Sequence, residues 1–162
     1  MLALYLTIWI ALALFVAGEV GRSGIGPRPW AWWASALGLA MALLHTAIAF
    51  DVVHNWVHDD AVRRTALQTE AVFGARVGWG VYVNYVFFGV WLADAWWWRV
   101  GRPITRRPPG VTLALRGFYL VIILNAAVIF AAPSRRAVGL AIVALLAWTW
   151  RPRQLRGRTA PH

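Results

Sequence analysis

Three features of the sequence predict an all-α fold, a polytopic integral membrane bundle of about five transmembrane helices. Hydrophobic residues make up 60% of the 162 positions and charged residues only 14%, whereas a soluble domain keeps about a quarter of its residues charged. The apolar residues come in runs that approach the roughly 20 residues with which a helix crosses the hydrocarbon core. Arginine and tryptophan residues stand at the ends of these runs, where they mark membrane boundaries. We therefore expect one transmembrane domain over residues 1–162.

Five apolar runs and one amphipathic segment divide the chain. The first run lacks a basic leader, so we expect a retained helix. The fifth run has 14 residues and extends only about 21 Å as a helix. It either crosses with Trp148 and Trp150 in the headgroup layer, or forms a short re-entrant or interfacial helix beside four full spans. The predicted spans are 2–17, 30–50, 79–98, 111–132 and 137–150, with an extramembrane amphipathic segment over 59–75.

Small residues in the second run predict a close helix–helix contact. Ala34, Gly38 and Ala42 recur every four residues and so share one face of a helix. This small-xxx-small spacing lets two backbones approach in a membrane. It indicates packing and carries no chemistry.

The basic residues, all of them arginine, orient the predicted bundle. With five crossings, ten arginines fall on one side and five of the remainder on the other, and the richer side is cytoplasmic by the positive-inside rule. Most tryptophans lie at the same ends of the runs, as an aromatic belt does. We expect a multi-pass protein of a bacterial cytoplasmic (inner) membrane, with the N-terminus outside and the C-terminus in the cytoplasm. The absence of lysine favours a GC-rich bacterial genome.

Two charged residues lie inside predicted spans, where an isolated charge is costly. Asp94 stands about five residues from the end of the third run, and Arg116 about five residues into the fourth. A short connection between these runs places both at a similar depth. We predict an intramembrane Asp94–Arg116 ion pair, which either joins two helices or carries protons or ions.

A second polar group is expected near the opposite, outer side of the membrane. His45, Asn84 and Asn125 lie at comparable depths in three different runs, and Tyr85 follows Asn84 directly. Such side chains form interhelical hydrogen bonds in membranes. We predict a polar cluster of these four residues, with packing as its plainest role.

The densest group of potential ligands follows the second run. If that run continues as a helix, Asp51, His54 and His58 share one face, since they are three or four residues apart, and a fourth ligand comes either from Glu70 or from His45 one level deeper. Imidazole and carboxylate groups suit a divalent metal such as Zn, Fe, Mn or Cu(II). The alternative reading is structural: Asp59 or Asp60 caps the next helix, and the histidines are interfacial or titrate near neutral pH.

These observations leave three functional classes open. The first is an accessory or structural subunit of a larger membrane complex, because five short helices bury little interior of their own. The second is a metal-binding protein or metalloenzyme with its site at the outer face. The third is a proton- or ion-coupled transporter that uses Asp94, Arg116 and His45.

The chain has no cysteine, which excludes thiolate chemistry. The expected partners are the lipid bilayer and other membrane subunits or further copies of the chain. Nucleic acid is not expected, since the arginines form no single face.

Overall fold

The computed structural model describes residues 2–23, 28–100 and 107–151. These residues form helices joined by short connections and contain no strand, which confirms the all-α prediction. In chain order the elements are α1 (Leu2–Arg22), α2 (Pro29–Val52), α3 (His58–Phe73), α4 (Gly80–Arg99), α5 (Pro109–Leu124), the π-helical turn η2 (Asn125–Ile129) and α6 (Pro133–Thr149).

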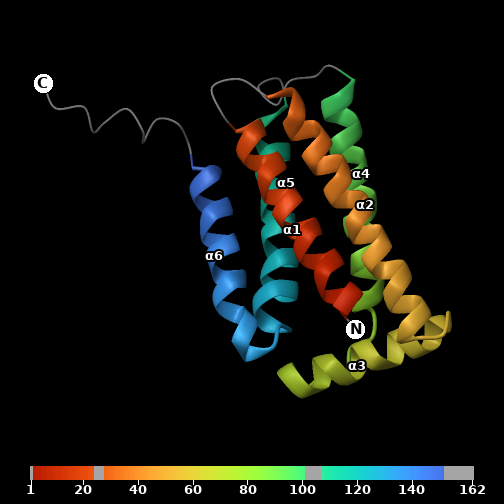
Figure 1. The fold of residues 1–162 in the computed structure, drawn as a ribbon. Coiled ribbons are helices and arrows are strands. Elements are labelled where there is room, and N and C mark those ends of the chain that lie inside the picture. The colour runs from red at the N-terminus through yellow and green to blue at the C-terminus, as the bar shows by residue number, and fades with distance from the viewer. Residues whose placement is uncertain (1, 24–27, 101–106, 152–162) are drawn as a thin grey trace, which may run out of the picture.

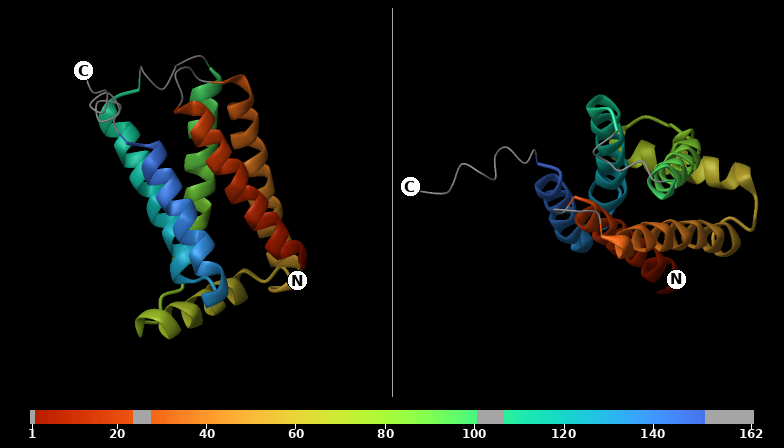
Figure 2. Two further views of the ribbon diagram at one scale, coloured as in Figure 1. Left: turned by 60° about the vertical axis from the view of Figure 1, so that its left-hand side comes forward. Right: turned by 90° about the horizontal axis from the view of Figure 1, so that it is seen from above.

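The helices α1, α2, α4, α5 and α6 stand side by side, and α3 lies across one end of them (Figures 1 and 2). The chain begins at the α3 end, where the label N stands in Figure 1. Because α1 and α4 run away from α3, the last turns of both reach the opposite end, and α6 ends there as well (Figure 1). This topology places α3 and the charged helix ends at opposite poles of the bundle.

By length and composition, three of the described helices can cross a membrane. They are α1 with 21 residues, α2 with 24, and α5 together with its π-helical turn, Pro109–Ile129, with 21. These three helices are compatible with a membrane protein. The fifth apolar run lies in α6, which begins at Pro133 and has 17 residues, so it remains shorter than the roughly 20 residues of a full span.

Local sequence explains where several helices begin and end. Proline stands in the first turn of α2, α5 and α6, where its missing N–H costs no hydrogen bond and its fixed φ suits the helix. Gly74 closes α3 with φ of 70°, and its N–H bonds the carbonyl of Glu70. A left-handed residue at this position is the usual glycine helix stop.

Small residues bring α1 and α2 into close contact. A Cβ added to Gly18 would lie 3.2 Å from the carbonyl oxygen of Ala31, and one added to Gly38 would lie 3.2 Å from that of Ala11. Ala34 and Ala42 are buried on the same face of α2. The small-residue stripe therefore packs against α1, as its spacing indicates.

Aromatic rings fill the space between α1, α4 and α5. Phe15 of α1 makes edge-on contacts with Trp91 of α4, at 5.0 Å between ring centroids, and with Tyr119 of α5, at 5.2 Å. Phe87 of α4 contacts both of these partners. The Nε1 of Trp91 donates to the Ser35 hydroxyl of α2 at 3.0 Å, so its polar atom is satisfied in the core.

The π-helical turn fits the end of α5 onto α6. The N–H of Phe130 bonds the carbonyl of Asn125 at 2.9 Å, the wider spacing of a π turn. The turn places the Ala127 carbonyl where a Cβ on Gly139 would overlap it. Glycine is therefore required at this position of α6.

Candidate functional site

A buried group of charged and aromatic side chains lies at the end of the bundle opposite α3. Its centre is Asp94 of α4, which is 5% exposed. Arg22, in the last turn of α1, donates from Nη1 to Asp94 Oδ2 at 2.7 Å and from Nη2 to Oδ1 at 2.8 Å. Arg107, two residues before α5, donates to Oδ1 as well. Two guanidinium groups from different parts of the chain thus hold one carboxylate.

The group extends to α5 and α6. The Tyr119 hydroxyl of α5 donates to Asp94 Oδ2 at 3.3 Å. Glu19 of α1 accepts from Arg22 Nη1 at 3.1 Å and from Nε1 of Trp150 at 2.7 Å. We call these six residues the charge cluster: Glu19, Arg22, Asp94, Arg107, Tyr119 and Trp150.

Four donors reach the two oxygens of Asp94, two on each. A carboxylate offers about four lone-pair positions, so this one is filled. Buried charges of this kind persist only when they are paired and hydrogen-bonded. The arrangement suits a joint between helices, and it leaves no acceptor position on Asp94 for a substrate.

The structure corrects the predicted partner of Asp94. Arg116 contacts the charge cluster through Trp150: it donates from Nη1 to the Trp150 carbonyl at 3.4 Å, and its guanidinium stands 5.7 Å from the Trp150 ring centroid. Among the described residues, the ion pairs of Asp94 are with Arg22 and Arg107. Sequence reasoning placed these two arginines at the membrane boundary as topology signals and missed that they fold back onto the carboxylate. Their position one turn or less from a helix end was the available clue.

A cavity of about 10 Å³ remains between Arg116 and the charge cluster. This volume holds about one water molecule. The Nε atoms of Arg22, Arg107 and Arg116 are buried and, within the described ranges, have no hydrogen-bond partner. The cavity is too small for an organic substrate.

The four members of the predicted outer polar cluster lie with separate partners. His45 Nδ1 is 2.9 Å from the Leu4 carbonyl and 3.3 Å from the Thr7 hydroxyl, so it joins α2 to the first turns of α1. Asn125 Nδ2 donates to Val121 in its own helix at 2.7 Å. Asn84 is exposed on α4, and Tyr85 contacts a histidine of α3. In the part of the chain that the structure describes, they form no common cluster.

The predicted metal ligands are not brought together either. Helix α2 ends at Val52, and Asn55 and Trp56 have positive φ angles of 48° and 59°. This reversal turns the chain into α3, so the continuous helix that the prediction required does not exist. Within residues 2–23, 28–100 and 107–151, no group of three histidine or acidic residues could hold a metal ion.

Each of the four residues instead has its own neighbour. Asp51 accepts from Nε1 of Trp56 at 3.0 Å, and Glu70 pairs with Arg76 at 3.1 Å. His58 stands between two tyrosines of α4, with Nε2 3.2 Å from the Tyr82 hydroxyl and Nδ1 3.3 Å from that of Tyr85. His54 pairs with Asp60, which is described next.

Asp60 is the centre of a second, less buried group of charges at the start of α3. Its Oδ2 lies 3.0 Å from His54 Nδ1 and accepts from Arg64 Nε at 2.7 Å, while Oδ1 accepts from Arg63 Nη2 at 2.5 Å. The hydrogen bond from His54, followed by those from the two arginines, holds the pKa of Asp60 well below its usual range. A carboxylate in the first turn of α3 also stabilises the positive end of the helix dipole.

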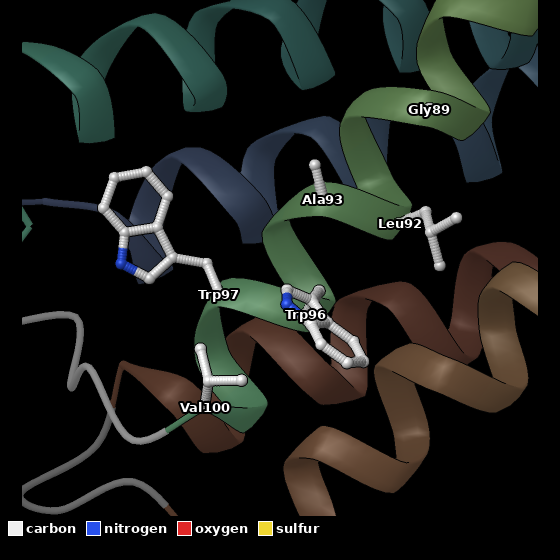
Figure 3. A pocket seen from close by; sticks show the side chains of 6 residues that line it. All are labelled: Gly89, Leu92, Ala93, Trp96, Trp97 and Val100. Atoms are coloured by element: carbon white, nitrogen blue, oxygen red, sulfur yellow. The ribbon is translucent and has the colours of Figure 1, made fainter.

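The outward face of α4 carries an apolar hollow of about 800 Å³ (Figure 3). Gly89 and Ala93 bring the smallest side chains to its lining, and beyond them the rings of Trp96 and Trp97 point to different sides of the helix (Figure 3). Trp96 is 67% exposed and Leu92 60%. A Cβ added to Gly89 would meet no atom within 4 Å. Nothing in the described chain covers this face.

Comparison of the chain with protein-family models, with curated proteins and with solved structures gives no match.

Proposed function

We propose that the chain is an accessory subunit of a larger bacterial membrane assembly, and that the outward face of α4 receives a transmembrane helix of a partner subunit. The hollow over Gly89 and Ala93 carries this proposal. Small residues at membrane-exposed positions let two helices approach closely, and transmembrane helices associate by such packing because lipid supplies no hydrophobic driving force between them.

The charge cluster supports a structural role for the bundle itself. Its ion pairs and hydrogen bonds connect α1, α4, Arg107 in the segment before α5, α5 itself and the end of α6. A bundle fastened in this way presents α4 as a rigid surface, and rigid surfaces lose little entropy on binding. The filled carboxylate of Asp94 favours this role over proton transport, which needs a group that gains and loses a proton.

The proposed location is the inner membrane, with α3 at the outer face. Arg22, Arg99 and Arg107 lie at the pole opposite α3, and a cytoplasmic position for that pole follows the positive-inside rule. A periplasmic reporter fused after residue 60 should be active and a cytoplasmic one silent. The reverse result would invert this topology.

The test of the subunit role is Gly89→Leu, with Gly117→Leu as the matched control. Both glycines lie in helices, and an added Cβ at either one meets nothing within 4 Å, so the two variants should fold alike. In blue-native electrophoresis of gently solubilised native membranes, we expect the wild type and Gly117→Leu to migrate in a complex. Gly89→Leu should migrate at the size of the free chain, because leucine fills part of the hollow.

Two outcomes would contradict the subunit proposal. A wild-type chain that migrates alone at all detergent concentrations has no stable partner. A complex that survives Gly89→Leu does not use this face of α4. A complex that contains only this chain, identified by mass spectrometry, would replace the partner subunit by further copies of the chain.

A further inference from the structure

A second cavity, of about 310 Å³, lies between the end of α2 and the side of α3. It shares no lining residue with the hollow of α4, and its volume is in the range of small-ligand sites. Its lining combines apolar and polar side chains: Val53, His54, Arg64, Thr65, Leu67 and Gln68.

Asp60 positions two of the lining side chains. It accepts a hydrogen bond from Arg64 Nε at 2.7 Å and lies 3.0 Å from His54 Nδ1. These contacts use one edge of the guanidinium and one ring nitrogen. The Nη atoms of Arg64 and the Nε2 of His54 have no hydrogen-bond partner among the described residues. A carboxylate that orients the ligating side chains from behind is a common means of preorganising a site.

The unused groups are mostly donors. Arg64 offers its two Nη groups, Gln68 its amide and Thr65 its hydroxyl, and all three line the cavity from α3 because Gln68 lies four residues from Arg64 and three from Thr65. In an imidazolium ring, the Nε2 of His54 is a further donor. Two N–H donors of a planar guanidinium match the spacing of two phosphate oxygens.

The two arginines beside the cavity favour an anion. Arg63 and Arg64 both pair with the carboxylate of Asp60, so these three side chains together carry one positive charge, with Asp59 beside them in the first turn of α3. Arg64 is 53% exposed and remains accessible. The cavity directly follows α2, a helix of 24 residues, which is longer than the hydrocarbon core requires and so ends at about the depth of lipid headgroups.

We infer that this cavity binds a phosphate group, with Arg64, Gln68, Thr65 and His54 around its oxygens and Asp60 as the positioning residue. The phosphate belongs either to a lipid headgroup, whose glycerol and first methylenes lie against Val53 and Leu67, or to inorganic phosphate. The chemistry of recognition is the same for both.

The experiment measures binding to the full-length protein in detergent by native mass spectrometry. The probes are short-chain phosphatidylglycerol, inorganic phosphate, and diacylglycerol as the lipid without phosphate. We expect saturable binding of phosphatidylglycerol and none of diacylglycerol. Arg64→Gln should weaken binding by at least about tenfold, the scale of one lost charged hydrogen bond.

Arg63→Gln is the matched control. It removes the same charge from the neighbouring position and breaks a pair with the same carboxylate, but Arg63 does not line the cavity. Its effect should stay within about threefold, as expected for an exposed, screened charge. Should Arg64→Gln lose its native melting temperature, Gln68→Ala tests the same site from an exposed position and should weaken binding severalfold.

The outcomes separate the sources and test the site. If inorganic phosphate binds and competes with the lipid, the ligand is phosphate itself. If only phosphatidylglycerol binds, the ligand is a lipid headgroup. Equal losses in Arg63→Gln and Arg64→Gln, equal binding of diacylglycerol, or no binding of either phosphate probe to the wild type would overturn the inference.

Discussion

The guanidinium of Arg22 and the carboxylate of Asp94, 72 residues apart in the chain, form a two-pronged ion pair at 2.7 and 2.8 Å. Both side chains are about 4% exposed. In a medium of low dielectric constant each charge would be costly alone, and geometry of this quality together with further hydrogen bonds offsets that cost. The pair fixes the end of α1 against α4 at the pole where the helices would otherwise fray.

Removal of the Asp94 charge should therefore destabilise the bundle strongly. Asp94→Asn leaves Arg22 and Arg107 buried without their counter-charge, and breaking a buried pair on one side costs about 3–5 kcal/mol of the free energy of unfolding. The measurement is unfolding of the purified protein by titration of SDS into mild detergent, followed by circular dichroism.

Arg116→Gln is the control for this change. Arg116 hydrogen-bonds the Trp150 carbonyl at 3.4 Å, and its loss should cost only about 1 kcal/mol, the net value of an ordinary hydrogen bond. The double variant Arg22→Gln/Asp94→Asn should be less unstable than the sum of its single variants, because the two residues interact directly. Additive losses, or an Arg116→Gln variant as unstable as Asp94→Asn, would show that the pairing is assigned wrongly.

The sequence predicted the fold class and the special status of Asp94 but not the partners of that residue. Run length and hydropathy depend on single segments, so they locate helices directly. A partner depends on how helices are placed side by side and on the reach of a flexible arginine. Arg22 and Arg107 stand at segment ends, where a topology signal and a buried ion pair look alike in sequence. Only the packed bundle distinguishes the two.

The predicted metal ligands lie apart for a different reason. It assumed that α2 continues past Val52, which would place Asp51, His54 and His58 on one face. The helix ends there, and Asn55 and Trp56 take positive φ angles. Such backbone conformations are uncommon outside glycine, although asparagine adopts them more often than most residues, so Asn55 was the one weak signal of the reversal in the local sequence. Because α2 ends at Val52, Asp51, His54 and His58 do not share a helical face.

Substitution within the small-residue stripe should destabilise the contact of α1 and α2. In Gly38→Val the new Cβ lies 3.2 Å from the Ala11 carbonyl oxygen and from the Leu14 Cβ, and the added methyl groups increase the overlap. Overpacking of this kind costs about 1–3 kcal/mol of the free energy of unfolding. The same SDS titration measures it.

Gly117→Val is the reference for that loss. A Cβ at Gly117 meets no atom within 4 Å, so this variant reports only the change in helix propensity, which favours valine over glycine slightly. The wild type and Gly117→Val should therefore unfold at similar SDS fractions. Equal destabilisation of both valine variants would mean that α1 and α2 do not pack through the stripe.

Acid should release the start of α3. The hydrogen bond from His54 and the pairs with Arg63 and Arg64 lower the pKa of Asp60 in the folded protein. A carboxyl group whose pKa is lower in the folded than in the unfolded protein stabilises the fold when it is ionised. This stabilisation is fully present above the unfolded-state pKa of about 4, and it is lost as the pH falls toward the folded-state pKa. Protection of the backbone amides of residues 53–65 from hydrogen exchange, expressed as protection factors, should therefore remain constant from about pH 6 to pH 4 and decline below that range.

Two variants identify Asp60 as the group that titrates. Asp60→Asn should show low protection of residues 53–65 that does not change further between pH 6 and pH 3. His54→Ala removes the largest contribution to the lowered pKa, so its decline should begin at a higher pH than in the wild type. A decline in Asp60→Asn that follows the wild-type curve would assign the acid sensitivity to another carboxylate, of which Asp59 in the same helical turn is the nearest in sequence.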